Sequence, residues 1–278
     1  MSKTTISIRQ PVSLSPENLF THTFSETIWR VMPHPDRDEW IVELRDAETK
    51  TVSWALLDLT TNQVLWQKSP SATEWWTTLA GFAGDRVFLH NYRFPDIPEP
   101  TDLLALSVAE GEVVWALPGW LFVRILPGTE QIVVAQKQAE RIQYQLCDSN
   151  SGLLKNPVLE KDLPAVTEPN HHIPVRYEPH DIYFRQLSAF LGRMVETQDA
   201  VAIDYLESDP YVVFSYYLYD QEKAAQYLLV VNRNREIIYH NLLSDKRPGI
   251  SLDTILLKNN HLVFLRNTNE LNSLTLTH

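Results

Sequence analysis

The feature of this sequence that most restricts its fold is a short motif that recurs along the chain, because a missed repeat misassigns the whole architecture. Each copy has two runs rich in Leu, Val and aromatic residues on either side of a residue that tolerates positive φ. That arrangement is typical of a tight β-hairpin. The copies are Trp54–Trp66 with Asn62 at the turn, Leu103–Trp115 with Gly111, Tyr144–Lys155 with Gly152, and a weaker copy, Tyr227–Tyr239, with Asn234.

Two further apolar runs precede each copy, so the repeating unit is a meander of four strands, about 45 to 50 residues long. That length and strand number are typical of a blade of a β-propeller, and the sequence predicts an all-β fold of this kind. The predicted first strands are 28–32, 77–82, 121–126, 201–206 and 252–257, and the predicted second strands are 40–44, 87–90, 132–135, 211–217 and 262–265.

The units add up to five four-stranded blades, of which the last is one strand short. We expect the N-terminal run Ile6–Ile8 to supply that outer strand, because such a closure removes exposed sheet edges. The spacing breaks once, since 80 positions separate Ile132 from Val212. A degenerate sixth blade in that stretch is the alternative to five blades.

The extra residues form an insertion at 157–199 within a single predicted domain, 1–278. The insertion begins as a proline-rich loop, and its second part has apolar residues at helical spacing. We therefore expect one amphipathic helix, whose apolar face must be buried against the blades or a partner. The apolar residues at that spacing are Ile182, Phe184, Leu187, Phe190, Leu191 and Met194.

The Leu-Leu-Ala-Leu-x-x-x-x-Gly-Glu-Val-Val-Trp stretch of residues 103–115 resembles the repeat of quinoprotein-type β-propellers. In that family the motif joins the two outer strands of a blade and its tryptophan packs between blades, which the resemblance implies for Trp66 and Trp115. Family enzymes have eight blades, a calcium site and often two adjacent cysteines, whereas this chain has only Cys147. The resemblance predicts the architecture and no quinone cofactor. The whole chain is also similar to bacterial families of unknown function.

The charge and the cysteine content restrict the partners and the compartment. The formal net charge is −11, which repels nucleic acid and anionic membranes and favours solubility. No run is long and apolar enough for a signal peptide or a membrane span. Cys147, the single cysteine, lies in a predicted strand, where we expect it to be buried and unreactive. These features predict a cytoplasmic protein.

Motifs of catalysis and cofactor binding do not occur in the sequence. It has no phosphate-binding glycine loop, no G-x-S-x-G, no H-E-x-x-H and no cysteine-based zinc pattern. The densest histidine group is His171, His172 and His180, in the insertion. It is a weak candidate for a metal site, because metal binding needs three or four converging ligands, and solvated loop histidines are the simpler interpretation.

One set of charged residues follows from the architecture, because the first strand of each blade lines the central channel of a propeller. Charged residues lie among apolar neighbours in four of these strands. They could bind a polar ligand, since arginine recognises carboxylate and phosphate, or they could form ion pairs that fill the channel. Ion pairing is the favoured interpretation. The four candidates are Arg30, Arg124, Asp204 and Asp253.

The sequence leaves the function unknown and favours a non-catalytic binding or protein-interaction module, because propellers present broad rigid faces. The alternative is an enzyme or sensor that binds a polar small molecule or a sugar at the channel. A protein partner docked on the insertion helix is a third hypothesis. The sequence predicts no cofactor and assigns no oligomeric state.

Overall fold

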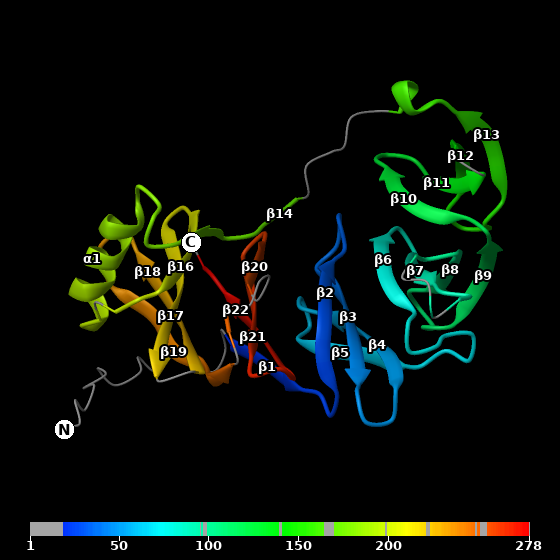
Figure 1. Cartoon of the computed structure of the whole chain (residues 1–278). Helices are drawn as coiled ribbons and strands as arrows, with labels where there is room; N and C mark the ends of the chain where they lie inside the picture. The colour runs from blue at the N-terminus through cyan, green and yellow to red at the C-terminus, as the bar shows by residue number, and fades with distance from the viewer. Residues whose placement is uncertain are drawn as a thin grey trace. The chain divides into compact units, whose positions relative to one another are not determined.

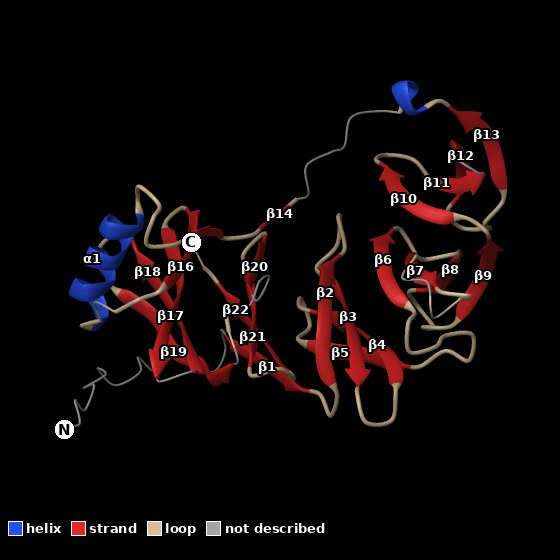
Figure 2. Cartoon of the chain, in the orientation of Figure 1, coloured by secondary structure: helices blue, strands red, loops and turns tan. Residues whose placement is uncertain are grey.

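The chain is all-β apart from short helical segments (Figures 1 and 2). The computed structural model describes residues 19–94, 96, 99–138, 141–163, 170–197, 199–220, 223–247, 249–250 and 255–277. Among these residues the strands pair in antiparallel ladders and form five sheets of four or five strands. The chain divides into two compact units, residues 24–170 and residues 1–23 with 171–278.

Residues 24–170 form a unit of three four-stranded sheets, hereafter the three-sheet unit, in which each sheet is a meander of consecutive strands. The first sheet contains β2 (Thr27–Pro33), β3 (Glu39–Asp46), β4 (Thr51–Asp58) and β5 (Gln63–Lys68). The second contains β6 (Thr78–Ala83), β7 (Arg86–Asn91), β8 (Asp102–Ser107) and β9 (Val113–Pro118). The third contains β10 (Leu121–Leu126), β11 (Gln131–Gln138), β12 (Arg141–Asp148) and β13 (Leu154–Val158), and the 3-10 turn η2 (Glu160–Asp162) follows it.

The other unit, hereafter the two-sheet unit, has two five-stranded sheets and a helix. One sheet has the order β15 (Val175–Tyr177), β16 (Ala202–Ser208), β17 (Tyr211–Asp220), β18 (Lys223–Asn232) and β19 (Ile237–Arg247). The other has the order β1 (Leu19–Thr23), β22 (Glu270–Thr275), β21 (His261–Arg266), β20 (Ile255–Lys258) and β14 (His171–His172). The helix is α1 (Phe184–Val195), which lies against the first of these sheets (Figure 1).

The strands agree with the meanders that the sequence predicts, and the predicted turn residues Asn62, Gly111 and Gly152 have positive φ. In the fourth copy the residue with positive φ is Arg235 and not Asn234, because Arg235 has the same offset from Tyr227 as Asn62 has from Trp54 and Gly111 has from Leu103. The strand that completes the last sheet also comes from the N-terminal part of the chain. It is β1, which pairs with β22, and not Ile6–Ile8, which lies outside the described residues.

The insertion differs from a loop followed by a helix. The predicted helix is present as α1, although Ile182 precedes it and is 84% exposed. The segment before α1 also contributes two short strands, because β14 pairs with β20 and β15 pairs with β16. Both sheets of the two-sheet unit therefore gain a fifth strand. Within the described residues, no helix has the length and the apolar character that crossing a membrane would require.

Alternate residues of each central strand face opposite neighbours, as the two-residue period of a strand requires. In β7, Val87 and Leu89 pack into the cluster shared with the first sheet, whereas Phe88 packs into the cluster shared with the third. Cys147 belongs to the latter cluster and is buried as predicted, and this burial raises the pKa of its thiol to about 11. The three-sheet unit is therefore held together by two apolar layers between its sheets.

A tryptophan of the outer strand links the first sheet to the second, and another links the second sheet to the third. The Trp66 indole donates a hydrogen bond from Nε1 to Val108 O (2.7 Å), and a Cβ atom placed on Gly111 would lie 3.0 Å from that ring. Trp115 repeats the contact one sheet later, with Nε1 donating to Ser149 O (3.1 Å) and the Gly152 Cβ position 2.8 Å from the ring. Glycine at these turns thus serves both the positive φ and the close approach of an indole.

We expect Gly152→Ala to destabilise the three-sheet unit more than Gly128→Ala. Both residues have positive φ, which costs alanine about 1 kcal/mol at either position. The added methyl group meets Trp115 only at position 152, since no atom lies within 4 Å of the Gly128 Cβ position. Displacing the indole should cost about 1–3 kcal/mol more. Denaturant unfolding of both variants measures the difference, and equal losses would contradict the contact.

Candidate functional site

A buried ion pair links the first two sheets of the three-sheet unit. The Glu43 side chain is fully buried, and its Oε1 accepts hydrogen bonds from Arg45 Nε (2.9 Å) and Nη2 (2.7 Å). Its Oε2 accepts the backbone N–H of Leu79 (2.7 Å) and the Thr78 hydroxyl (3.1 Å). Arg45 also donates to the carbonyls of Trp75 (2.7 Å) and Thr77 (3.2 Å). This network satisfies both charges, so it is a structural element.

The same arginine is covered by a stack of aromatic rings that we call the tryptophan platform, formed by Trp29, Arg45, Trp75 and Lys50. The Arg45 guanidinium carbon lies 4.9 Å from the centre of the Trp29 ring and 5.1 Å from that of Trp75. Lys50 Nζ lies 4.9 Å from the Trp75 ring centre. Trp29 is nevertheless 61% exposed, and Trp76, which follows Trp75 in the sequence, is 48% exposed. A large aromatic surface is thus held rigid by a buried ion pair.

The predicted channel residues Arg30 and Arg124 occupy equivalent positions in the three-sheet unit. Each first strand has a one-residue β-bulge, and the residue after the bulge is Arg30 in β2, Gly81 in β6 and Arg124 in β10. Arg30 is exposed and donates from Nη1 to Leu79 O (2.7 Å). In the part of the chain that the structure describes, Arg124 Nε is buried and has no hydrogen-bond partner.

His90 on β7 belongs to the same region. Its Nε2 accepts the backbone N–H of Phe122 (3.0 Å), so the ring carries no proton on that nitrogen. Burial, together with a smaller effect of the nearby charge of Arg30, lowers the pKa of His90 to about 4. The imidazole is therefore neutral at physiological pH and joins β7 to β10 as a hydrogen-bond acceptor.

The two acidic residues predicted to line the channel, Asp204 and Asp253, belong to the other part of the chain, residues 171–278. Asp204 on β16 is buried and forms a bidentate ion pair with Arg176 of β15, with distances of 2.7 Å and 2.9 Å. Arg176 also lies over the Tyr217 ring, 5.3 Å from its centre. Asp253 lies outside the described residues. The structure therefore relates Arg30 to Arg124 and pairs Asp204 within its own sheet, whereas the four-residue set stays a prediction.

The histidines of the insertion are spread over two segments. His171 and His172 are adjacent residues of β14, so their side chains point to opposite faces. Burial lowers the pKa of His171. His180 is highly exposed, with Glu178 and Asp181 3.8 Å and 3.9 Å from its ring nitrogens. Searching the described residues finds no group of three or more His, Cys, Asp or Glu side chains that could hold a metal ion.

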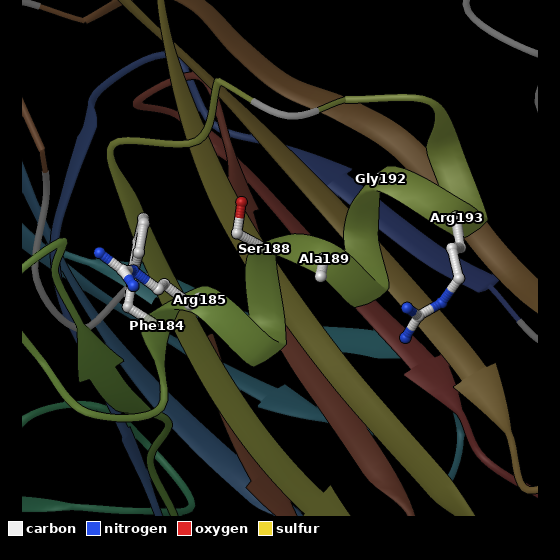
Figure 3. A pocket seen from close by; sticks show the side chains of 6 residues that line it. All are labelled: Phe184, Arg185, Ser188, Ala189, Gly192 and Arg193. Carbon is white, nitrogen blue, oxygen red and sulfur yellow. The ribbon is translucent and has the colours of Figure 1, made fainter.

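A hollow of about 450 Å³ lies against the outer face of α1 (Figure 3). Arg185 and Arg193 stand at its two ends, and the small residues Ser188, Ala189 and Gly192 lie between them. Both arginines are exposed. The opposite face of the helix is bound to the sheet, where Phe190 stacks on Phe214 with ring centres 5.1 Å apart.

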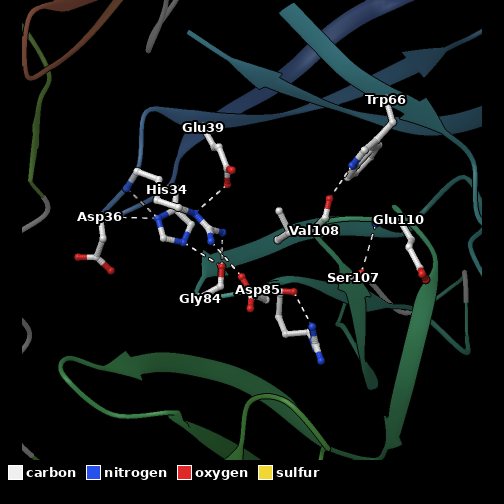
Figure 4. Close-up of polar contacts among 11 residues, drawn as sticks. His34, Asp36, Glu39, Trp66, Gly84, Asp85, Ser107, Val108 and Glu110 are labelled. Carbon is white, nitrogen blue, oxygen red and sulfur yellow. Dashed lines mark hydrogen bonds and ion pairs between the residues drawn. The ribbon is translucent and has the colours of Figure 1, made fainter. Parts of the chain in front are cut away.

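A buried histidine joins loops of the first and second sheets (Figure 4). His34 Nδ1 accepts the backbone N–H groups of Asp36 (3.0 Å) and Arg37 (3.1 Å), so Nε2 carries the hydrogen that is donated to Gly84 O (3.0 Å). Arg37 adds an ion pair to Asp85 (2.9 Å). Each His34 nitrogen is used in holding the two loops together, which makes this residue structural.

Sequence reasoning missed the Glu43–Arg45 pair, the platform and the Arg176 partner of Asp204. A signal existed for Glu43, since it is a charged residue inside the apolar run Trp40–Leu44. The adjacent tryptophans Trp75 and Trp76 lie before β6 and not in a strand, so the alternation of a strand does not determine which of them is buried. Tyr216 and Tyr217 are both buried, one on each face of β17.

Breaking the ion pair from one side should cost more than removing it entirely. We expect Glu43→Leu and Arg45→Met each to lower the free energy of unfolding by about 3–5 kcal/mol, because each leaves a buried charge without its partner. The double variant should lose less than the sum of the two. Denaturant unfolding of the four proteins measures this coupling, and strict additivity would contradict the pairing.

His90 should make stability depend on pH below neutrality. The unfolded imidazole takes up a proton near pH 6.5, whereas the folded one does so only near pH 4. Its stabilising contribution is therefore complete above about pH 6.5 and is lost as the pH falls towards 4, by about 2–3 kcal/mol. In His90→Gln this component should be absent. Unfolding of both proteins between pH 7 and 4.5 tests it, and parallel profiles would refute it.

Sequence comparisons connect part of the chain to an uncharacterised family. A family model described as "Domain of unknown function (DUF4905)" matches residues 34–115, which is less than half of the chain. The matched segment runs from His34 to Trp115 and contains the Glu43–Arg45 pair and the Trp66–Gly111 contact. No curated protein matches the chain.

Solved structures give weak similarities. The β-propeller domain of the Trilobed protease from Pyrococcus furiosus is 9% identical with a TM-score of 0.34, over 89% of this chain and 65% of that chain, so this chain spans less than two thirds of its length. An uncharacterized protein from Listeria monocytogenes is 10% identical (TM-score 0.34, 91% and 95% covered). A duf4221 family member from Bacteroides vulgatus is 8% identical (TM-score 0.33, 96% and 97% covered). Similarities this weak carry no argument about this chain.

Proposed function

We propose that this protein is a five-bladed β-propeller that acts as a non-catalytic interaction module and recognises a protein partner through the tryptophan platform. The observation that carries the proposal is the exposure of Trp29, 61%, on top of an arginine that is itself only 7% exposed. Exposed aromatic residues beside arginine are typical of the few residues that dominate binding energy in protein interfaces. The platform combines such residues with a fixed geometry.

Rigidity is the second support for this role. Arg45 makes hydrogen bonds to one carboxylate and two carbonyl groups, so its guanidinium cannot move without breaking them. The rings stacked on it therefore lose little conformational freedom on binding, and a preorganised surface binds more tightly than a mobile one. Lys50 at the edge of the stack adds a positive charge suited to an acidic partner.

The blade count and the quinoprotein-like repeat belong to the same proposal. Their support is the four-strand meander, repeated in all three sheets of the three-sheet unit, and the tryptophan contact, repeated in two of them. In the two-sheet unit Tyr239 stands in the tryptophan's place, with its ring centre 5.4 Å from that of Phe264. A cytoplasmic location is also proposed, supported by the acidic composition and by the single, buried cysteine.

A non-catalytic role is supported by how the buried charges are used. In both the Glu43–Arg45 and the Asp204–Arg176 pair, two guanidinium nitrogens donate to the carboxylate, to one oxygen of Glu43 and to both oxygens of Asp204. A general acid or base needs a proton-transfer path to a substrate, and these pairs offer none. A second candidate, a sensor or enzyme that binds a polar small molecule at the first strands, is favoured by the partnerless Nε of Arg124 among the described residues.

The interaction role is tested by affinity capture with the full chain. Immobilised wild type should retain a defined protein from an extract of the source organism, and the purified partner should bind with measurable affinity. Trp29→Ala should weaken that affinity by about 2 kcal/mol, or about thirtyfold, as expected of a central interface residue. Lys50→Ala should weaken it less.

Leu65→Ala is the matched control, because Leu65 is also an exposed apolar residue (46%) of the first sheet but lies outside the platform. It should bind as the wild type does. Circular dichroism establishes that every variant is folded. Equal affinities for wild type and Trp29→Ala, or no partner retained by the wild type, would overturn the proposal.

A further inference from the structure

We propose that Arg30 and Arg124 form a binding site for a small oxyanion, carboxylate or phosphate, on the first strands of the three-sheet unit. The site is separate from the tryptophan platform and deepens the second candidate function, the binding of a polar small molecule. The proposed ligand is an oxyanion, because the planar guanidinium group recognises oxyanions through paired hydrogen bonds.

The backbone places the two arginines alike. In β2, β6 and β10 the register shifts at the same step, between Ile28 and Arg30, between Leu79 and Gly81, and between Phe122 and Arg124. A bulge redirects the side chains that follow it and raises the local twist. Arg30 and Arg124 therefore occupy the same position on the two strands that flank β6.

The strand between them offers no side chain at that level. Gly81 is the equivalent residue of β6, and a Cβ atom there would lie 2.6 Å from the Phe122 ring. Side chains from both flanks thus reach β6, since the Phe122 ring covers Gly81 and the Arg30 guanidinium donates to Leu79 O (2.7 Å). Glycine at position 81 leaves the space that the Phe122 ring of β10 occupies.

The positive charge at this place is not neutralised by the contacts seen. Arg30 uses one nitrogen on a neutral carbonyl, and the buried Nε of Arg124 has no partner in the described chain. A buried unpaired N–H of a charged group is costly, and a ligand oxygen would remove that cost. The Glu43 carboxylate, opposite Arg30 in register, is already paired with Arg45. His90, which is close enough for the charge of Arg30 to lower its pKa, accepts the Phe122 N–H and is neutral.

The experiment compares anions at constant ionic strength. The thermal midpoint of the full chain is measured in sodium chloride and with inorganic phosphate or succinate replacing part of the chloride. We expect a concentration-dependent rise with at least one oxyanion, because a ligand that binds only the folded state stabilises it by mass action. A response to phosphate alone identifies a phosphate ligand, and a response to succinate alone identifies a carboxylate.

Variants then assign the effect to residues. Arg30→Ala and Arg124→Ala should each weaken the apparent affinity by about tenfold or more, since each removes a charge-assisted hydrogen-bonding group. Arg124→Lys keeps the charge without the fork and should be intermediate. Arg141→Ala is the matched control, because Arg141 is an exposed arginine of the same sheet as Arg124, and it should respond as the wild type does.

The proposal is overturned if neither oxyanion raises the midpoint of the wild type above the chloride baseline. It is equally overturned if Arg30→Ala and Arg124→Ala respond as the wild type does. Arg30 is exposed, so Arg30→Ala decides the question should Arg124→Ala fail to fold. Lys50→Ala should leave the anion response unchanged while it weakens partner binding, so failure of this site and failure of the platform are distinguishable.

Discussion

Burial of both faces of each sheet is the constraint on which the three-sheet unit depends. A central strand such as β7 has apolar side chains on both faces, so its sheet is stable only between two others. Such layers bury much apolar area but do not fix how the sheets are aligned. The indole contacts supply the alignment, because Trp66 and Trp115 each fit one backbone carbonyl and one glycine of the next sheet. Directional hydrogen bonds and close steric fit together fix the alignment of the sheets, which nonspecific apolar burial does not.

The buried charged side chains of Glu43 and Asp204 also have specific hydrogen-bond partners. Glu43 is fully buried, and its desolvation is tolerated because four hydrogen bonds reach its two oxygens. Asp204 accepts two hydrogen bonds from Arg176. Both ring nitrogens of His34 are hydrogen-bonded to backbone groups. Among the described residues, Arg124 Nε is a buried donor without a hydrogen-bond partner, as are Arg86 Nε and the indole Nε1 atoms of Trp40 and Trp54. Of these four donors, Arg124 Nε is the one that belongs to a first strand, where we propose that an oxyanion binds.

The strands and their turns could be predicted from the sequence because both depend on local chemistry. Two-residue alternation and a turn residue such as Gly152 mark a hairpin wherever they occur. The pairing of distant segments has no such local signal. The sequence of residues 19–23 has no feature that predicts their pairing with β22 in the last sheet. Arg176 lies in a proline-rich stretch whose composition predicts a loop and not the strand β15. Charge among apolar neighbours predicts Arg30 and Arg124 from the sequence. The equivalence of Gly81 to these two arginines depends on the bulges in β2, β6 and β10, which have no local sequence signal.

The shared bulge also explains how one scaffold can display different chemistry from equivalent places. Each bulge presents two successive residues, and these are Trp29 and Arg30 in β2, Ala80 and Gly81 in β6, and Val123 and Arg124 in β10. The bulge is the same in the three strands, and only the side chains at its two residues differ. In β2 the Trp29 ring packs on Arg45, whereas Arg30 donates a hydrogen bond to Leu79 O of β6, so these adjacent residues contact different neighbours. In β6 the small pair makes room for its neighbours. The three bulges thus present three different dipeptides from one repeated backbone feature.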